Sequence, residues 1–229
     1  LHFVIGVFIY YVLSLILGLK YPASQIWLAF VGWTSIGNSN WYIFTIMLMY
    51  FITFVAFYKS KTENYTRPLL FSLVLTFIAS LLMSYFKADY WYNTMFCYTA
   101  GIFFSSYKNK IECHTKTHYW PMLIIAVIAL VVLCRIPYSA KGLVYNGFSV
   151  VFCSVVILLT MKFRCESKVL LWCGQNLFPL YIYQRIAMIA LSSINNGALA
   201  AGYPFLFTVA CLVITIAITK AYKYIAVKL

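Results

Sequence analysis

Eight apolar stretches constrain what this chain can fold into. A helix needs about 17–25 mainly apolar residues to cross a bilayer, and a backbone without water must satisfy its own hydrogen bonds. Hydrophobic residues make up 64% of the 229 positions and charged residues only 9%, far from the balance of a soluble domain. The sequence therefore predicts an all-α, polytopic transmembrane helix bundle of about eight spans, forming a single integral membrane domain over residues 1–229. The predicted spans are Leu1–Leu19, Trp41–Tyr58, Leu69–Phe86, Tyr92–Tyr107, Tyr119–Cys134, Leu143–Met161, Leu177–Ile194 and Tyr203–Thr219. The run Ile26–Trp33 is too short to span and is predicted to be interfacial or re-entrant.

Basic residues are divided unevenly between alternate loops. The loops after the second, fourth and sixth predicted spans, together with the C-terminal tail, hold twelve Lys and Arg, whereas the other loops hold four. Cytoplasmic loops of membrane proteins carry such an excess of positive charge. The pattern predicts that both chain ends are cytoplasmic. It also accounts for the net charge of +13, so no nucleic-acid partner is inferred.

The seventh predicted span carries a polar stripe. Helical spacing of three, four and seven residues places its polar and polarisable side chains on one face: Tyr181, Gln184, Arg185, Met188 and Ser192. A charge near the bilayer centre costs about 2.5–3.5 kcal/mol on insertion scales, so this face must point into protein or a wet cavity. Two interpretations stay open: a structural hydrogen-bond clasp between helices, or one wall of a substrate cavity.

A second polar segment opens the second predicted span. Asn40 precedes Trp41 there, and Asn satisfies free backbone donors at a helix start. Trp41 suits the membrane interface, where aromatic residues gather. Anchoring is the simpler interpretation; a carbohydrate contact is the alternative, because sugars stack on aromatic rings and hydrogen-bond to Asn.

Other chemistry is poorly supported by the sequence. Cys113, His114 and His118 lie among lysines and are interpreted as a solvated loop, so no metal site is predicted. The seven cysteines show no paired spacing, and no disulfide framework is expected. The four acidic residues all lie in predicted loops, which disfavours carboxylate-driven transport.

Three segments together resemble the acyltransferase-3 family of membrane O-acyltransferases. They are Asn38–Phe44 followed by Tyr50, the segment Thr99–Phe104, and the segment Cys173–Gln184. The resemblance implies transfer of an acyl group, usually acetyl, from acyl-coenzyme A to a hydroxyl of a cell-envelope polysaccharide or lipid-linked glycan. It also implies a bacterial inner membrane location and contact with membrane lipid. Acyl-coenzyme A is expected as a donor substrate, not as a permanently bound cofactor.

The resemblance has one notable departure and one missing part. Gln184 stands where the family commonly has His, and an amide cannot act as a general base. The family's Arg and His are expected upstream of Leu1, which makes this chain a fragment that alone transfers no acyl group. The residues expected to line the cavity are Gln184, Arg185, Tyr181, Asn176, Trp41 and Asn40. The alternative function is a non-enzymatic glycan or lipid translocator, which needs no acyl donor.

Overall fold

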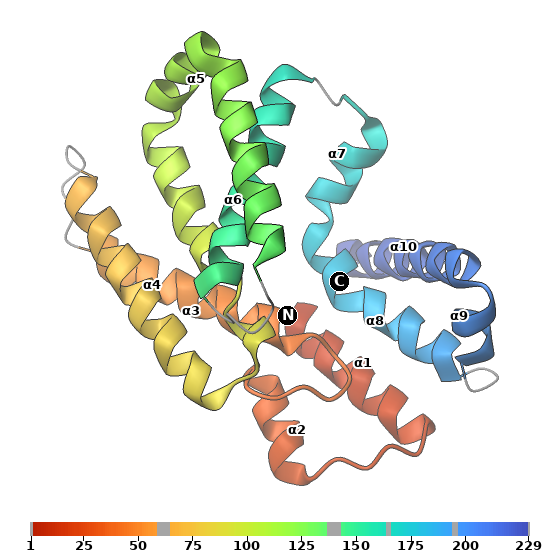
Figure 1. Ribbon diagram of the computed structural model, residues 1–229. Coiled ribbons are helices and arrows are strands. Elements are labelled where there is room, and N and C mark those ends of the chain that lie inside the picture. Colours follow the sequence, from red (N-terminus) through yellow and green to blue (C-terminus); the bar gives the residue numbers. More distant parts are fainter. Residues whose placement is uncertain (1, 59–64, 137–142, 164–165, 194–196, 229) are drawn as a thin grey trace. The chain divides into compact units, whose positions relative to one another are not determined.

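Every regular element in the computed structural model is a helix over the residues that it describes, which are 2–58, 65–136, 143–163, 166–193 and 197–228 (Figure 1). The predicted all-α class is therefore confirmed. The helices are α1 (His2–Ile16), α2 (Ala23–Phe30), α3 (Asn40–Phe57), α4 (Thr66–Phe86), the 3₁₀ turn η1 (Asp89–Trp91), α5 (Met95–Arg135), α6 (Leu143–Lys162), α7 (Lys168–Gln175), α8 (Leu177–Ser193), α9 (Ala198–Gly202) and α10 (Pro204–Lys228).

Within the described ranges, five helices are long and apolar enough to cross a membrane: α3, α4, the stretch formed by η1 and α5, α6 and α10. Helices α1 and α8 are shorter, at 15 and 17 residues. The spans predicted for these two helices are longer than the helices themselves, because apolar residues continue beyond the helix ends. Membrane-spanning helices are thus present, as predicted, while the total of eight spans stays a prediction.

Helix α5 contains two of the predicted spans and bends sharply between them (Figure 1). Its backbone leaves the helical region at Tyr107 and at His118. The residues between these two points were predicted to be a loop, but they are helical. They contain neither Gly nor Pro, and Lys108 pairs with Glu112 one turn later at 3.7 Å, which supports a helix. The break at His118 precedes Pro121, whose ring is incompatible with the helical hydrogen bond to Thr117.

The described chain forms two compact units. The first unit comprises Leu1–Phe44 and Glu166–Leu229, and the second comprises Thr45–Cys165. Helix α3 begins in the first unit and continues in the second. The division into units therefore does not test whether the chain is a single membrane domain, which stays a prediction.

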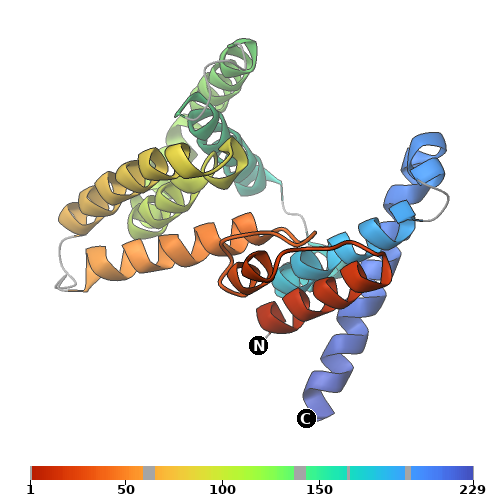
Figure 2. The same cartoon turned by 90° about the horizontal axis from the view of Figure 1, so that it is seen from below.

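The first unit is built on helices α1, α2, α8 and α10. Helix α1 lies beside α8, and α8 packs on α10 (Figure 2). Its buried core holds Val7, Tyr10, Ala29 and Ile36, with Ile186 and Ile189 of α8 packed against it. The segment Ile26–Trp33, predicted to be interfacial or re-entrant, overlaps the eight-residue helix α2, and its place relative to a membrane stays a prediction.

The second unit pairs α4 with α5 and α5 with α6. Ser72, Thr76 and Ser80 recur every four residues on α4 and are buried, and the Thr76 hydroxyl lies 2.9 Å from the Thr99 hydroxyl of α5. Asn146 of α6 donates to the Tyr92 carbonyl at 3.1 Å and accepts from the Phe96 amide at 3.3 Å. Small and polar residues of this kind let membrane helices approach closely and hydrogen-bond to each other.

Candidate functional site

The site lies in the first unit, where the segment before α3 meets α8. A turn at Gly37 precedes it; the φ of Gly37 is 89°, a conformation that favours glycine. Asn38 then accepts a hydrogen bond from the Ile36 amide at 3.0 Å. This turn directs Asn38, Ser39 and Asn40 into the protein, where Asn38 and Asn40 are buried.

Asn40 holds the segment in place. Its side-chain amide donates to the Ala29 carbonyl at 2.8 Å and to the Thr34 carbonyl at 2.6 Å, and its oxygen accepts a hydrogen bond from the Asn38 amide. Both amide protons and the oxygen are therefore occupied within the protein. Asn40 thus acts as a structural tie between α2 and the start of α3.

Helix α8 contributes the two residues that reach this segment. The Tyr181 hydroxyl donates to the Ser39 carbonyl at 3.0 Å, and Arg185 Nη1 donates to Ser39 Oγ at 3.4 Å. Tyr181 and Arg185 are one helical turn apart, as the polar stripe predicts. No carboxylate forms an ion pair with Arg185 among the described residues. The guanidinium therefore keeps donors for a further group.

Aromatic rings surround this contact. The Tyr181 ring lies 4.5 Å from the Tyr42 ring and 6.4 Å from the Trp41 ring, and Trp41 meets Tyr42 edge-on at 6.0 Å. These separations are typical of stabilising aromatic pairs. The structure therefore brings together Asn40, Trp41, Tyr181 and Arg185 of the six predicted site residues.

Tyr10 of α1 belongs to the same cluster and was not predicted. Its side chain is almost fully buried, and its hydroxyl donates to the Ile182 carbonyl at 2.7 Å. Gly6 lies one turn earlier on the same face, and a Cβ there would approach Ile182 Cγ2 to 2.5 Å. The sequence signal that could have revealed this is the Gly6 and Tyr10 pair, a small residue and a hydrogen-bond donor four positions apart.

The remaining predicted residues lie elsewhere or face outward. Gln184 is exposed on α8, as are Met188 and Ser192. Asn176 is buried where α7 ends, and its amide donates to the Trp172 carbonyl at 2.6 Å. Asn176 therefore has a local role at the end of α7, and no contact joins it to Ser39 within the described part of the chain.

The cavity inside the cluster is very small. Its volume is about 10 Å³, and it is bounded by Tyr10, Ser39, Asn40 and Tyr181 together with apolar residues of α1. A water molecule needs about 10–15 Å³ of such volume, so at most one fits. The interior of the cluster is thus a hydrogen-bonded clasp, and chemistry with a larger molecule needs its outward face, where Arg185 is half-buried and Gln184 exposed.

The histidines of the α5 bend do not build a metal centre. The His114 and His118 rings lie 4.8 Å apart, but the described residues contain no group of three or more His, Cys, Asp or Glu side chains suited to a metal ion.

No family model, no curated protein and no solved structure matches the chain. The function therefore has to be argued from the residues and the geometry of the site.

Proposed function

We propose that this chain is part of a membrane O-acyltransferase of the bacterial inner membrane, with both chain ends in the cytoplasm. It transfers an acetyl or other acyl group from acyl-coenzyme A to a hydroxyl of an envelope polysaccharide or lipid-linked glycan. The resemblance of three separate segments to the acyltransferase-3 family supports this proposal, as does the membrane character of the helices.

The observation that carries the proposal is the state of Arg185. It lies in the middle of α8 among apolar residues, and its hydrogen bond to Ser39 leaves its positive charge without a carboxylate partner in the described ranges. Charged residues in membrane helices are costly and are found mainly where function needs them. An arginine with free donors binds carboxylate or phosphate groups through a planar, two-pronged contact. An anionic group on the substrate fits this position.

Acyl transfer presents two such groups. The acceptor hydroxyl attacks the thioester carbonyl, a C–O bond forms, the C–S bond breaks, and coenzyme A leaves as a thiol with the proton from the hydroxyl. Negative charge develops on the carbonyl oxygen during attack, and the coenzyme also carries phosphates. In this proposal Arg185 stabilises one of these charges, and a general base carries the proton from the hydroxyl to the departing sulfur.

Neighbouring side chains supply orientation. Gln184 is exposed next to Arg185 and offers both a donor and an acceptor. Trp41 and Tyr181 present aromatic rings close by, a surface on which a sugar ring can stack.

Substitution of Arg185 tests the proposal. Membranes from cells that express the gene are incubated with acetyl-labelled acetyl-coenzyme A, and label in envelope glycan is measured. Arg185→Ala should lower transfer by about 100-fold, the loss typical for removal of one donor to a developing oxyanion. Arg185→Lys should also be impaired, because the ammonium group lacks the planar fork.

Arg135→Ala is the matched control, since Arg135 is an exposed arginine in the last turn of α5 and should be replaceable without loss. Full transfer by Arg185→Ala at normal protein level would overturn the role of Arg185. Glycan export that depends on this gene, without any incorporation from acetyl-coenzyme A, would instead support the translocator.

A further inference from the structure

The second unit contains two adjoining hollows that share residues. The apolar hollow lies between α4 and α5 and has a volume of about 370 Å³. Its walls include Leu69, Leu70 and Leu73 from α4 and Phe96, Ala100 and Phe103 from α5. Leu70, Leu73 and Phe103 are among the exposed hydrophobic residues, so the hollow opens sideways, toward the surface that lipid covers.

The length of the apolar hollow matches one leaflet of a membrane. On α5 its wall runs along one helix face from Phe96 to Tyr107, which are eleven residues apart. At a rise of about 1.5 Å per residue this row is about 16 Å long. Half of a hydrocarbon core of about 30 Å is about 15 Å. The hollow therefore has the reach of an acyl chain that enters from the interface.

The polar hollow begins where the apolar one ends. The two share Thr66 and Tyr107, whose hydroxyl groups lie 2.9 Å apart. Beyond them a space of about 600 Å³ is lined by Ser105, Ser106, Lys108, Asn109 and Lys110. Tyr107 is also the point at which the α5 backbone leaves the helical region, so the bend of α5 separates the apolar wall from the polar one.

The charge of the polar hollow favours an anion. Among the described residues, its lining holds two lysines and no acidic side chain. Lys108 contacts Glu112 at 3.7 Å, but both side chains are partly exposed, and exposed pairs of this kind are weak. The Lys110 ammonium lies 5.9 Å from the centre of the Tyr107 ring, beside the junction of the two hollows. A phosphate in the polar hollow has two lysines, the hydroxyl groups of Ser105, Ser106 and Thr66, and the Asn109 amide among its lining residues.

We propose that these two hollows bind one anionic phospholipid, with an acyl chain between α4 and α5 and the phosphate at Lys108 and Lys110. A zwitterionic lipid brings its own cation beside the two lysines, which offsets the attraction of its phosphate, and a free phosphate leaves the apolar hollow unused. The lateral opening favours a molecule that arrives from the bilayer. This site lies wholly within the second unit and does not depend on the proposed transferase activity.

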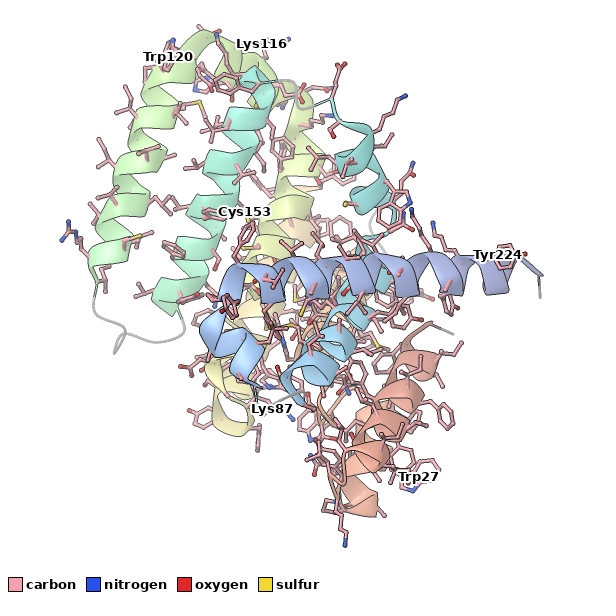
Figure 3. The ribbon with its side chains drawn as sticks, turned by 90° about the vertical axis from the view of Figure 1, so that its right-hand side faces the viewer. Trp27, Lys87, Lys116, Trp120, Cys153 and Tyr224 are labelled. Carbon is pink, nitrogen blue, oxygen red and sulfur yellow. The ribbon has the colours of Figure 1, made fainter. Side chains whose placement is uncertain are left out.

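Lys116 and Trp120 are labelled in Figure 3 at the bend of α5. Lys116 belongs to the same charged segment but does not line the polar hollow. It therefore provides a control for loss of charge without loss of the site.

The test measures lipid retention by the full chain in a zwitterionic detergent, using native mass spectrometry. The probes are palmitoyl-oleoyl phosphatidylglycerol and the matching phosphatidylcholine. Two lysines near the membrane surface contribute enough attraction for at least about a tenfold preference for the anionic lipid. The pair Lys108→Gln/Lys110→Gln should abolish this preference, whereas Lys116→Gln/Lys168→Gln, which removes the same charge elsewhere, should keep it.

A photoactivatable phosphatidylglycerol with a diazirine in its acyl chain locates the bound chain. Labelling should concentrate on the peptides that contain Leu69–Leu73 and Phe96–Phe103, and Ala100→Trp, which fills the hollow, should reduce it. Equal retention of both lipids, equal losses in the two double variants, or label spread evenly over the helices would overturn the proposal. Displacement of the lipid by inorganic phosphate alone or by acetyl-coenzyme A would also overturn it and assign the polar hollow to that ligand.

Discussion

Replacement of Asn40 by Ala is the most direct test of the clasp at the start of α3. The change removes three hydrogen bonds at once: two to the carbonyls of Ala29 and Thr34, and one from the Asn38 amide. Asn40, Ala29 and Asn38 are buried, so water cannot easily replace the lost partner. The methyl group of Ala neither donates nor accepts.

The magnitude follows from the groups left without partners. Each buried polar group that loses its partner costs about 1–3 kcal/mol. Two of the three hydrogen bonds are fully buried and the third partly, and such losses are not additive. We expect a loss of about 2–5 kcal/mol in the free energy of unfolding. Asn40→Asp should be at least as harmful, because it places a carboxylate oxygen against two carbonyl oxygens.

Thermal unfolding in detergent without added lipid measures this loss. For a chain of this size, 1 kcal/mol lowers the melting temperature by about 2–4 °C, so Asn40→Ala should melt about 4–20 °C lower. Asn109→Ala is the control, since Asn109 is an exposed asparagine and should melt like the wild type. If Asn40→Ala kept the melting temperature of the wild type but lost glycan binding, Asn40 would be a ligand contact and not a structural tie.

Two further predictions concern helix packing. Gly6→Ala should lower the free energy of unfolding by about 1–3 kcal/mol, because the added Cβ clashes with the branched side chain of Ile182. Gly147→Ala is the control: it lies in a helix with open space around it and should be neutral or slightly stabilising. The melting curves of the two variants test this difference. The sulfur atoms of Cys97 on α5 and Cys153 on α6 lie 3.9 Å apart. Mild oxidation should therefore join them in a disulfide, detected by mass spectrometry as a linked pair of peptides. A disulfide from either cysteine to Cys134 instead would contradict the pairing of these helices.

Long apolar runs bounded by charged residues were predicted well. Helices α3 and α6 begin and end within one residue of the predicted spans, and α4 ends at the predicted residue. Such runs have only one way to satisfy their backbone in a membrane, so length and composition nearly define them. A break between the two apolar halves of α5 was also predicted, since the charged residues 108–118 separate them.

The prediction of a loop for the charged segment of α5 was wrong. Residues 108–118 were interpreted as a loop because they are polar, yet charge alone does not end a helix. Lys, Glu and other straight-chain residues are good helix formers, and the segment holds no residue that breaks a helix. Charge did not mark the end of the secondary structure there.

The site was predicted only in part, because its contacts join distant parts of the chain. The spacing of Tyr181 and Arg185 placed them on one helix face, but nothing local indicated that Ser39 would be their partner. Tyr10 was missed for the same reason: its role depends on the Ile182 carbonyl, 172 positions away. Asn40 was correctly placed at a helix start, but its predicted role there was wrong, because its side chain bonds to Asn38 and to the Ala29 and Thr34 carbonyls and not to the free backbone donors of α3.

Two positive features converge at Ser39, and both favour the anionic group proposed to bind beside Arg185. The first turn of a helix carries a partial positive charge equivalent to about half an elementary charge, and Ser39 directly precedes α3. The Arg185 guanidinium donates to the hydroxyl of this same residue. Positive charges of this kind repel each other in apolar surroundings, and the hydrogen bond from Tyr181 to the Ser39 carbonyl holds α8 close to the start of α3. A phosphate or a developing oxyanion beside Arg185 interacts favourably with both. The clasp and the proposed substrate contact therefore depend on the same residues. The hydrogen bonds of the clasp hold Ser39 in place, and the Ser39 hydroxyl in turn holds the Arg185 guanidinium.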